Sequence, residues 1–167
     1  MLEVTRKDDF FYVHASLLLN APRYEVFAAL TQYDRFDEFS KRYQENGFVE
    51  PAPDSTPRVY TKVKGCVFFF CRTIERYARL ELQPNDLISA IVEPEGSDFE
   101  YGVETWALED LGEQTRVVYD HEAKLGFWVP PLIGVWAMRR ILKEDSLKAA
   151  RAIEQLALEN MSLAVTK

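Results

Sequence analysis

The stretch from Thr115 to Glu159 reads TRVVYDHEAKLGFWVPPLIGVWAMRRILKEDSLKAARAIEQLALE and combines two periodicities. Its first part, up to Leu125, alternates between apolar and polar positions. The apolar parity is made of Val117, Tyr119, His121, Ala123 and Leu125. This period of two predicts a strand with one face against a core and the other face in water.

After this strand, Pro130 and Pro131 mark the start of a long helix. Proline is tolerated in the first turn of a helix but breaks its interior, and no later proline occurs in the chain. At about 1.5 Å per residue, a helix from Pro131 to Glu159 would be long enough to cross a whole sheet. Asp145 and Ser146 interrupt its apolar stripe. The stripe consists of Val135, Met138, Leu142, Ala149, Ile153 and Leu156.

The residues before Thr115 predict a first strand, two short helices and a series of further strands. The first strand spans Phe11 to Leu19, and the two short helices follow it up to Phe39. The later strands lie near Tyr43–Val49, Val59–Val63, Phe69–Leu82, Leu87–Val92 and Phe99–Leu108. Short strands with tight connections indicate an antiparallel meander. We therefore expect an α+β fold, with a curved sheet of about six to seven strands wrapped around the C-terminal helix.

Two of these strands carry residues whose orientation matters for a site. In the strand before the last, the alternation predicts Tyr101 and Val103 on the apolar inner face, and Glu104 in water. In the strand near Phe69–Leu82, Arg72 and Arg76 share the parity of the apolar residues. In a regular strand their guanidinium groups point inward and can meet a carbonyl or carboxylate, whereas a bulge would turn them to solvent.

The formal net charge of −7 disfavours nucleic acid as a direct partner, and it disfavours an anionic membrane as a purely electrostatic target. With 47% hydrophobic and 28% charged residues, the composition is globular and no boundary divides it, so we expect one domain over residues 1–167. The chain shows neither a secretory signal nor an apolar stretch long enough to cross a bilayer. We expect a cytoplasmic protein, with peripheral contact to the inner membrane as an option.

The two cysteines, Cys66 and Cys71, lie in the run GCVFFFC. On one extended strand, this odd separation places the two thiols on opposite faces, and a disulfide would need a local reversal of the chain. We therefore expect both cysteines to be reduced and buried, as in a cytosolic protein.

Three motifs, taken in their order along the chain, resemble those of the START-like polyketide cyclase/dehydrase and lipid-transport superfamily (SRPBCC). They are LLLNAPRYEVFAALTQYDRFDEFS (Leu17 to Ser40), EGSDFEYGVETWAL (Glu95 to Leu108) and FWVPPLIG (Phe127 to Gly134). The branch with the most similar motifs holds the coenzyme Q-binding proteins and the bacterial ribosome-association toxin. The resemblance implies a helix-grip fold whose cavity, between sheet and C-terminal helix, binds lipids, isoprenoid quinones, polyketides or similar molecules.

Enzymatic motifs are scarce. The sequence contains no GxSxG, GxxxxGK[ST], GxGxxG or HExxH pattern, and its only histidines are His14 and His121. We expect neither a metal site nor a cofactor, and we assign no catalytic residue. Asp120 and Glu122 flank His121 on the opposite face of the strand, so they cannot orient its imidazole. His121 is then a hydrogen-bonded core residue, a polar ligand contact or a general base.

The ligand-binding candidates come from the predicted inner faces and from the junction of sheet and helix. They are Arg76, Tyr101, Val103, Tyr119, His121, Phe127, Trp128, Val135, Met138 and Leu142. Phe127, Trp128 and Trp136 either pack in the core at the helix start or form a pocket mouth that touches a membrane.

Three functions fit these observations. The first is a carrier or sensor that binds an apolar small molecule and needs no catalytic group. The second is a cyclase or dehydratase in which Tyr119, His121 and Arg76 polarise a carbonyl. The third is a protein-binding module acting on ribosomes or a membrane complex, which the negative net charge disfavours.

Overall fold

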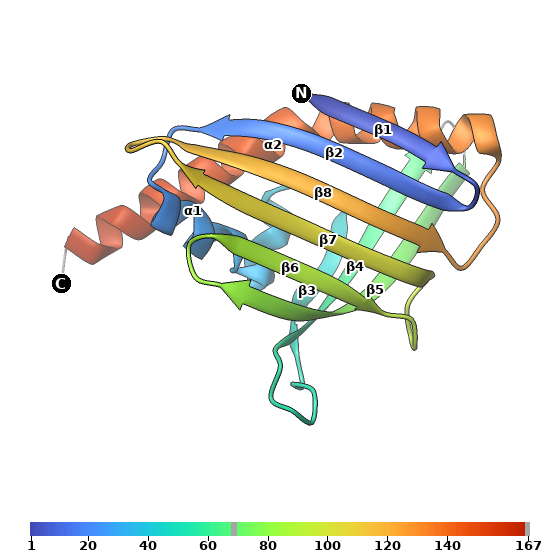
Figure 1. Cartoon of the computed structure of the whole chain (residues 1–167), viewed down its shortest axis with the longest axis horizontal. Helices are drawn as coiled ribbons and strands as arrows, with labels where there is room; N and C mark the ends of the chain where they lie inside the picture. The colour runs from blue at the N-terminus through green and yellow to red at the C-terminus, as the bar shows by residue number, and fades with distance from the viewer. Residues whose placement is uncertain (68–69, 166–167) are drawn as a thin grey trace.

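The computed structural model describes residues 1–67 and 70–165 and has one curved antiparallel sheet with helices on one face (Figure 1). The sheet has eight strands in the order β1-β2-β8-β7-β6-β5-β4-β3. The strands are β1 (Leu2–Lys7), β2 (Phe10–Leu19), β3 (Tyr43–Val49), β4 (Arg58–Val67), β5 (Phe70–Gln83), β6 (Leu87–Glu93), β7 (Phe99–Asp110) and β8 (Thr115–Leu125). The α+β helix-grip architecture expected from the sequence is confirmed.

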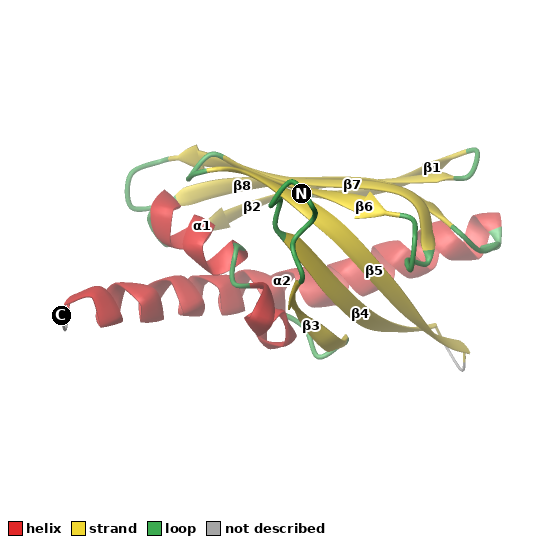
Figure 2. Cartoon of the chain, turned by 90° about the horizontal axis from the view of Figure 1, so that it is seen from below, coloured by secondary structure: helices red, strands yellow, loops and turns green. Residues whose placement is uncertain are grey.

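Three helical segments cover the inner face of the sheet: α1 (Arg23–Leu30), the 3₁₀ segment η1 (Tyr33–Glu38) and α2 (Pro131–Val165). Figure 2 shows the sheet curving over α2, with α1 between the sheet and the C-terminal half of α2. The core lies mainly at this end, where Leu30, Leu108, Val117, Ile153 and Leu156 are almost fully buried. Within the described ranges, no helix is long and apolar enough to span a membrane.

Strand β1 makes the sheet larger than predicted. It pairs antiparallel with β2 through a turn in which Asp8 adopts a φ of 54°. Val4 is its one fully buried side chain, while its outward residues are exposed. This edge strand buries so little apolar surface that its alternation in the sequence is weak.

The prediction of two reduced cysteines is wrong, because the run GCVFFFC is not one strand. Strand β4 ends at Val67, β5 begins at Phe70, and the two strands pair antiparallel. In the resulting hairpin, Cys66 lies directly opposite Cys71, and the two form a disulfide with their Cα atoms 4.0 Å apart. The reversal that a disulfide requires is therefore present.

The orientation predicted for Tyr101 and Val103 is also wrong. The pairing of β7 with β8 shifts register between Phe99 and Tyr101, as in a β-bulge, and the extra residue reverses the parity of the rest of the strand. Glu104 consequently faces inward and retains 6% exposure, whereas Tyr101 lies on the outer face and retains 41%. A single irregularity thus exchanges a tyrosine for a buried carboxylate on the inner face.

Candidate functional site

The inner face of β7 and β8 changes its chemistry along the two strands. Directly opposite pairs are formed there by Leu108 and Val117, Trp106 and Tyr119, Glu104 and His121, and Gly102 and Ala123. From the end near α1 outward, the face is thus first apolar, then aromatic, then ionisable and finally lined by small residues. The ionisable part of this series is the candidate site.

A buried ion pair lies at the centre of this site. Nη1 of Arg76, on β5, donates to Oε2 of Glu104, and Nε of Arg76 donates to Oγ1 of Thr61 at 3.3 Å. Nε1 of Trp106 donates to the other carboxylate oxygen of Glu104 at 2.8 Å. Burial by itself would raise the pKa of Glu104, but Arg76 and the other neighbours lower it below its usual value. The carboxylate therefore stays ionised, and the pair has no net charge.

Arg76 faces inward, as a regular strand requires, whereas Arg72 lies at the exposed end of β5. The Arg72 guanidinium stands over the ring of Phe127, 3.5 Å from the ring centroid, and lies 3.8 Å from a carboxylate oxygen of Asp98. The two arginines of one parity thus have different environments, since only Arg76 has a buried carboxylate partner.

His121 is a neutral imidazole beside this ion pair. Burial, which disfavours the charged form, lowers the pKa of His121 to about 4, although Glu104 acts in the opposite direction. Its Nε2 atom is buried and has no hydrogen-bond partner among the described residues. The reading of His121 as a fully hydrogen-bonded core residue therefore does not hold for this nitrogen.

Three tyrosines complete the cluster. Burial and the nearby Glu104 carboxylate raise the pKa of Tyr43 to about 12 and raise the pKa values of Tyr33 and Tyr119 as well, so all three phenols remain protonated. The ring of Tyr119 packs on Trp106 with centroids 4.4 Å apart. Tyr33 is fully buried, and its hydroxyl has no partner within the part of the chain that the structure describes.

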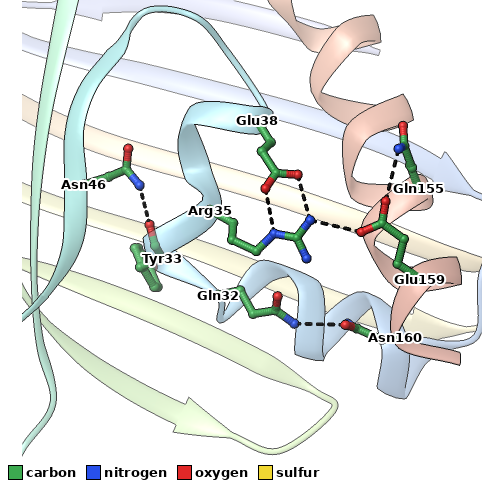
Figure 3. A network of polar contacts seen from close by, with 8 residues as sticks. All are labelled: Gln32, Tyr33, Arg35, Glu38, Asn46, Gln155, Glu159 and Asn160. Carbon is green, nitrogen blue, oxygen red and sulfur yellow. Dashed lines mark hydrogen bonds and ion pairs between the residues drawn. The ribbon is translucent and has the colours of Figure 1, made fainter. Parts of the chain in front are cut away.

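Polar contacts hold the segment that carries Tyr33 in place (Figure 3). Nδ2 of Asn46, on β3, donates to the carbonyl of Tyr33 at 2.8 Å. Arg35 pairs with Glu38 at 2.6 Å and with Glu159 of α2 at 3.0 Å. These contacts tie η1 to both the sheet and the long helix, so the Tyr33 side chain has a defined position.

The sequence-predicted helix residues lie on one stripe of α2. Val135, Met138 and Leu142 are half-buried, while Ile153 and Leu156 on the same stripe are almost completely buried. Asp145, which interrupts the stripe, accepts hydrogen bonds from Nε of Arg42 at 2.6 Å and from Oγ of Ser40 at 3.1 Å. The interruption thus anchors α2 to the residues just before β3.

Several inward-facing residues of the site keep contact with solvent. Trp106, Tyr119 and His121 belong to the face that points towards α2, yet each is only half-buried. Their neighbours Leu108 and Val117 on the same strands are buried. Packing between sheet and helix is therefore less complete around Tyr119 and His121 than it is next to α1.

The surface pockets near these strands are lined mostly by other residues, and His121 is the member of the site that one of them includes. A pocket of about 220 Å³ beside the loop from β8 to α2 is lined by residues that include Phe11, Phe127 and Trp128, and Trp128 is 79% exposed. A groove of about 490 Å³ on the outer face is lined by residues that include Tyr101 and Val103. Phe127 and Trp128 thus lie at the expected junction, whereas Tyr101 and Val103 line the opposite face of the sheet.

Sequence reasoning missed Glu104, Tyr33 and Tyr43. Glu104 was assigned to the wet face because nothing in the sequence marks the bulge that precedes it. Tyr33 and Tyr43 lie in or next to the short connection after α1. The sequence has no regular apolar period there from which the direction of a side chain could be predicted. The spacing of the aromatic residues from Tyr33 to Phe39 was the feature of the sequence that could have indicated a buried Tyr33. The structure buries Tyr33, Phe36 and Phe39 in the core.

The family described as polyketide cyclase / dehydrase and lipid transport matches residues 19–153. No curated protein sequence matches the chain.

Among solved structures, the chain is similar to the Zhui aromatase/cyclase from Streptomyces sp. R1128, with a TM-score of 0.69 and 13% identity over 91% of this chain and 96% of that one. It is similar to a START superfamily protein from Mycobacterium smegmatis, with a TM-score of 0.68 and 12% identity over 89% of this chain and 97% of that one. Human STARD10 gives a TM-score of 0.64 and 8% identity over 99% of this chain and 76% of that one. At these identities, the likeness shows the fold.

Proposed function

The chain belongs to the polyketide cyclase/dehydrase and lipid transport family, and on that premise we propose that it binds an apolar small molecule between the inner face of its sheet and helix α2. The observation that carries the proposal is the incomplete packing around Tyr119 and His121. Half-buried aromatic and aliphatic side chains that face one another across a domain are typical walls of a ligand site.

The proposed lining differs from the set expected from the sequence. Tyr101 and Val103 leave it because they lie on the outer face, and Glu104 and Tyr43 join it, whereas Tyr33 is buried in the core behind them. Phe127 and Trp128 lie at its entrance, beside the loop that leads into α2. The remaining walls are Arg76, Trp106, Tyr119, His121, Val135, Met138 and Leu142.

The expected affinity is moderate. Burial of about 300 Å² of apolar ligand surface gives roughly 7 kcal/mol of gross driving force at the usual coefficient. Loss of translational and rotational freedom consumes much of it, so we expect dissociation constants in the micromolar range.

The test is binding of the uncharged dye N-phenyl-1-naphthylamine, followed by its fluorescence, together with mass spectrometry of organic extracts of the purified protein. Leu142→Trp, which enlarges a half-buried wall residue of α2, should abolish dye binding in a protein that still folds. Leu158→Trp is the matched control, because Leu158 is 53% exposed on the same helix, and it should bind like the wild type. Equal binding by both variants would place the dye elsewhere and contradict the proposal.

A second candidate function is cyclase or dehydratase chemistry on a carbonyl compound. It is favoured by the spacing of Tyr119 and His121, whose ring centroids lie 6.2 Å apart, so that both side chains can polarise one substrate carbonyl. Turnover of a polyketide-like substrate that is lost in His121→Phe, with ligand affinity retained, would establish it over simple binding.

The same proposal includes three further points. They are the class of the ligand, a cytoplasmic location and the contacts that the protein makes outside the pocket. Trp128 is an exposed aromatic side chain at the proposed entrance, and aromatic side chains of this kind lie well in the interface of a membrane. A brief contact of this loop with the inner membrane would let an apolar ligand enter without crossing water. Binding to ribosomes is the less favoured alternative, because the net charge of −7 opposes RNA.

A further inference from the structure

We infer that the outer face of the sheet is a docking surface for a second protein, and that the groove across β1, β2, β8 and β7 binds an extended, basic segment of that partner. This inference goes beyond the proposed function, because the groove lies on the face of the sheet opposite to the proposed ligand site.

The groove is built from two rows of side chains that cross four neighbouring strands (Figure 1). Strand pairing places the members of each row directly opposite one another. One row consists of Glu3, His14, Asp120 and Thr105. The next row consists of Thr5, Tyr12, Glu122 and Val103. Both rows line the groove of about 490 Å³, together with Tyr101.

This face of the sheet is open to a partner. None of the helical segments in the described ranges covers it, since α1 and α2 lie on the opposite face (Figure 2). Glu3, Thr5, Tyr101 and Asp120 are exposed, and Tyr12 is half-buried. The side chains of the groove are therefore in reach of a second protein.

Aromatic rings give the groove an apolar part. The ring of Phe10 lies beside the rings of Tyr12 and Tyr101, with centroids 6.5 Å and 5.7 Å away. Tyr101 keeps 41% of its surface exposed. An exposed tyrosine ring binds the flat guanidinium of an arginine and the apolar stem of a lysine or arginine. The rings thus favour the same kind of partner as a negative charge does.

The carboxylates of the groove have no lysine or arginine partner. Glu3 and Glu122 form no ion pair with any described residue, and Asp120 is paired with the imidazole of His14 at 2.6 Å. Several other carboxylates of the outer face do have basic partners. These pairs are Glu75 with Lys62, Glu93 with Arg58, and Glu109 with Arg116. The groove is thus a place where negative charge is left uncompensated, so it is complementary to a basic partner.

The dimensions of the groove fit an extended chain. Neighbouring strands lie about 4.8 Å apart, so the three spacings from β1 to β7 measure roughly 14 Å. An extended segment rises about 3.3 Å per residue, and about four to five residues therefore cross the groove. Side chains on one side of such a segment repeat about every 7 Å, so two long basic side chains can reach Glu3 on β1 and Glu122 on β8. A small amine cannot meet both carboxylates in this way.

The experiment uses the peptide acetyl-Arg-Thr-Arg-Thr-Arg-amide as the probe. Its comparison probes are the same peptide with glutamine in place of arginine, and the small polyamine spermidine. Dissociation constants are measured by titration calorimetry at neutral pH and low salt. We expect the arginine peptide to bind with a dissociation constant on the order of 100 μM and to lose about tenfold in affinity in roughly 0.5 M salt, because exposed charges are screened. The glutamine peptide should not bind measurably.

Variants of equal net charge assign the binding to the groove. Glu3→Gln/Glu122→Gln should weaken binding of the arginine peptide roughly tenfold. Glu81→Gln/Glu95→Gln is the matched control, because both residues are exposed and neither lines the groove, and it should bind like the wild type. Tyr101→Ser leaves the charge unchanged and should weaken binding several-fold through the loss of the ring. Circular dichroism checks that each variant is folded.

The inference is overturned if the two double variants weaken binding equally, because the peptide would then respond only to net charge. It is also overturned if the glutamine peptide binds as well as the arginine peptide, or if spermidine binds as tightly as the arginine peptide, which would assign the groove to small polyamines. These variants should all bind N-phenyl-1-naphthylamine like the wild type, so a failure of the groove leaves the proposed function intact. A wild-type protein that binds the arginine peptide in the groove but binds no dye would contradict the proposed function alone.

Discussion

The two ends of the inner face are built on the same strands but differ in what fills them. Next to α1, Leu108 and Val117 face each other and pack with Ile153 and Leu156 of α2 into a buried core. We call this the closed end. Further along β7 and β8, the paired positions hold Glu104 and His121, and then Gly102 and Ala123. We call this the open end.

The difference shows how one sheet can provide both stability and a binding surface. At the closed end, α1 lies between the sheet and α2, so apolar side chains from three elements fill the space. At the open end α2 faces the strands without α1, and the inward residues of β7 and β8 are polar or small, while Phe11 and Val13 of β2 are buried beside them. Buried polar groups are tolerated there because Arg76 and Glu104 are hydrogen-bonded to each other and together have no net charge. Four predictions test this contrast, from the largest expected effect to the smallest.

Breaking the ion pair should be the most costly change at the open end. Arg76→Met leaves the Glu104 carboxylate buried without its partner, and we expect a loss of about 3 to 5 kcal/mol in the free energy of unfolding, measured with urea. The double variant Arg76→Met/Glu104→Met should recover most of this loss, because it removes both charges. A double variant as unstable as the single one would show that the cost comes from packing and not from charge.

Two leucines on the same stripe of α2 compare the packing of the ends directly. Leu156→Ala removes a side chain that is 1% exposed at the closed end and should cost about 2 to 5 kcal/mol. Leu142→Ala removes a half-buried side chain at the open end and should cost only about 1 kcal/mol, because it adds to a space that is already incompletely packed. Equal costs in urea unfolding would mean that the open end is as tightly packed as the closed end.

The pH dependence of stability isolates His121. Its pKa is about 4 in the folded protein against the usual 6.5 of a histidine side chain, so the unfolded chain binds more protons between these values. Stability is therefore complete above about pH 6.5 and falls as the pH decreases towards 4, by about 2 kcal/mol at pH 5. His121→Gln cannot take up this proton, and its free energy of unfolding should change less between pH 7 and pH 5. A slope identical to that of the wild type would contradict the assignment to His121.

The contacts that hold η1 to α2 should contribute least. Arg35→Gln removes the ion pairs with Glu38 and Glu159 shown in Figure 3, which are exposed to solvent. We expect a small decrease in Tm at low ionic strength that disappears in about 1 M salt, because screening weakens exposed pairs. A decrease that persists in high salt would show that Arg35 acts through packing against α2.

Sequence patterns predicted the elements that bury a continuous apolar face. The alternation of β8 and the stripe of α2 are long and regular, and the structure has both, with α2 starting at Pro131 as expected. Antiparallel pairing of the remaining strands followed from their short connections. The inward orientation of Tyr119 and His121 could be predicted for the same reason, since side chains alternate strictly in a regular strand.

Other features depend on contacts between segments that are distant in sequence. The bulge near Phe99 reverses the direction of Glu104, and a bulge arises from how β7 pairs with β8, not from the residues of β7 alone. The disulfide likewise required the hairpin that brings Cys66 opposite Cys71. By itself the sequence determined the set of elements, through local periodicity. Only the tertiary structure decided which charged and phenolic groups meet beneath the sheet, because pairing register and side-chain burial are properties of the assembled fold.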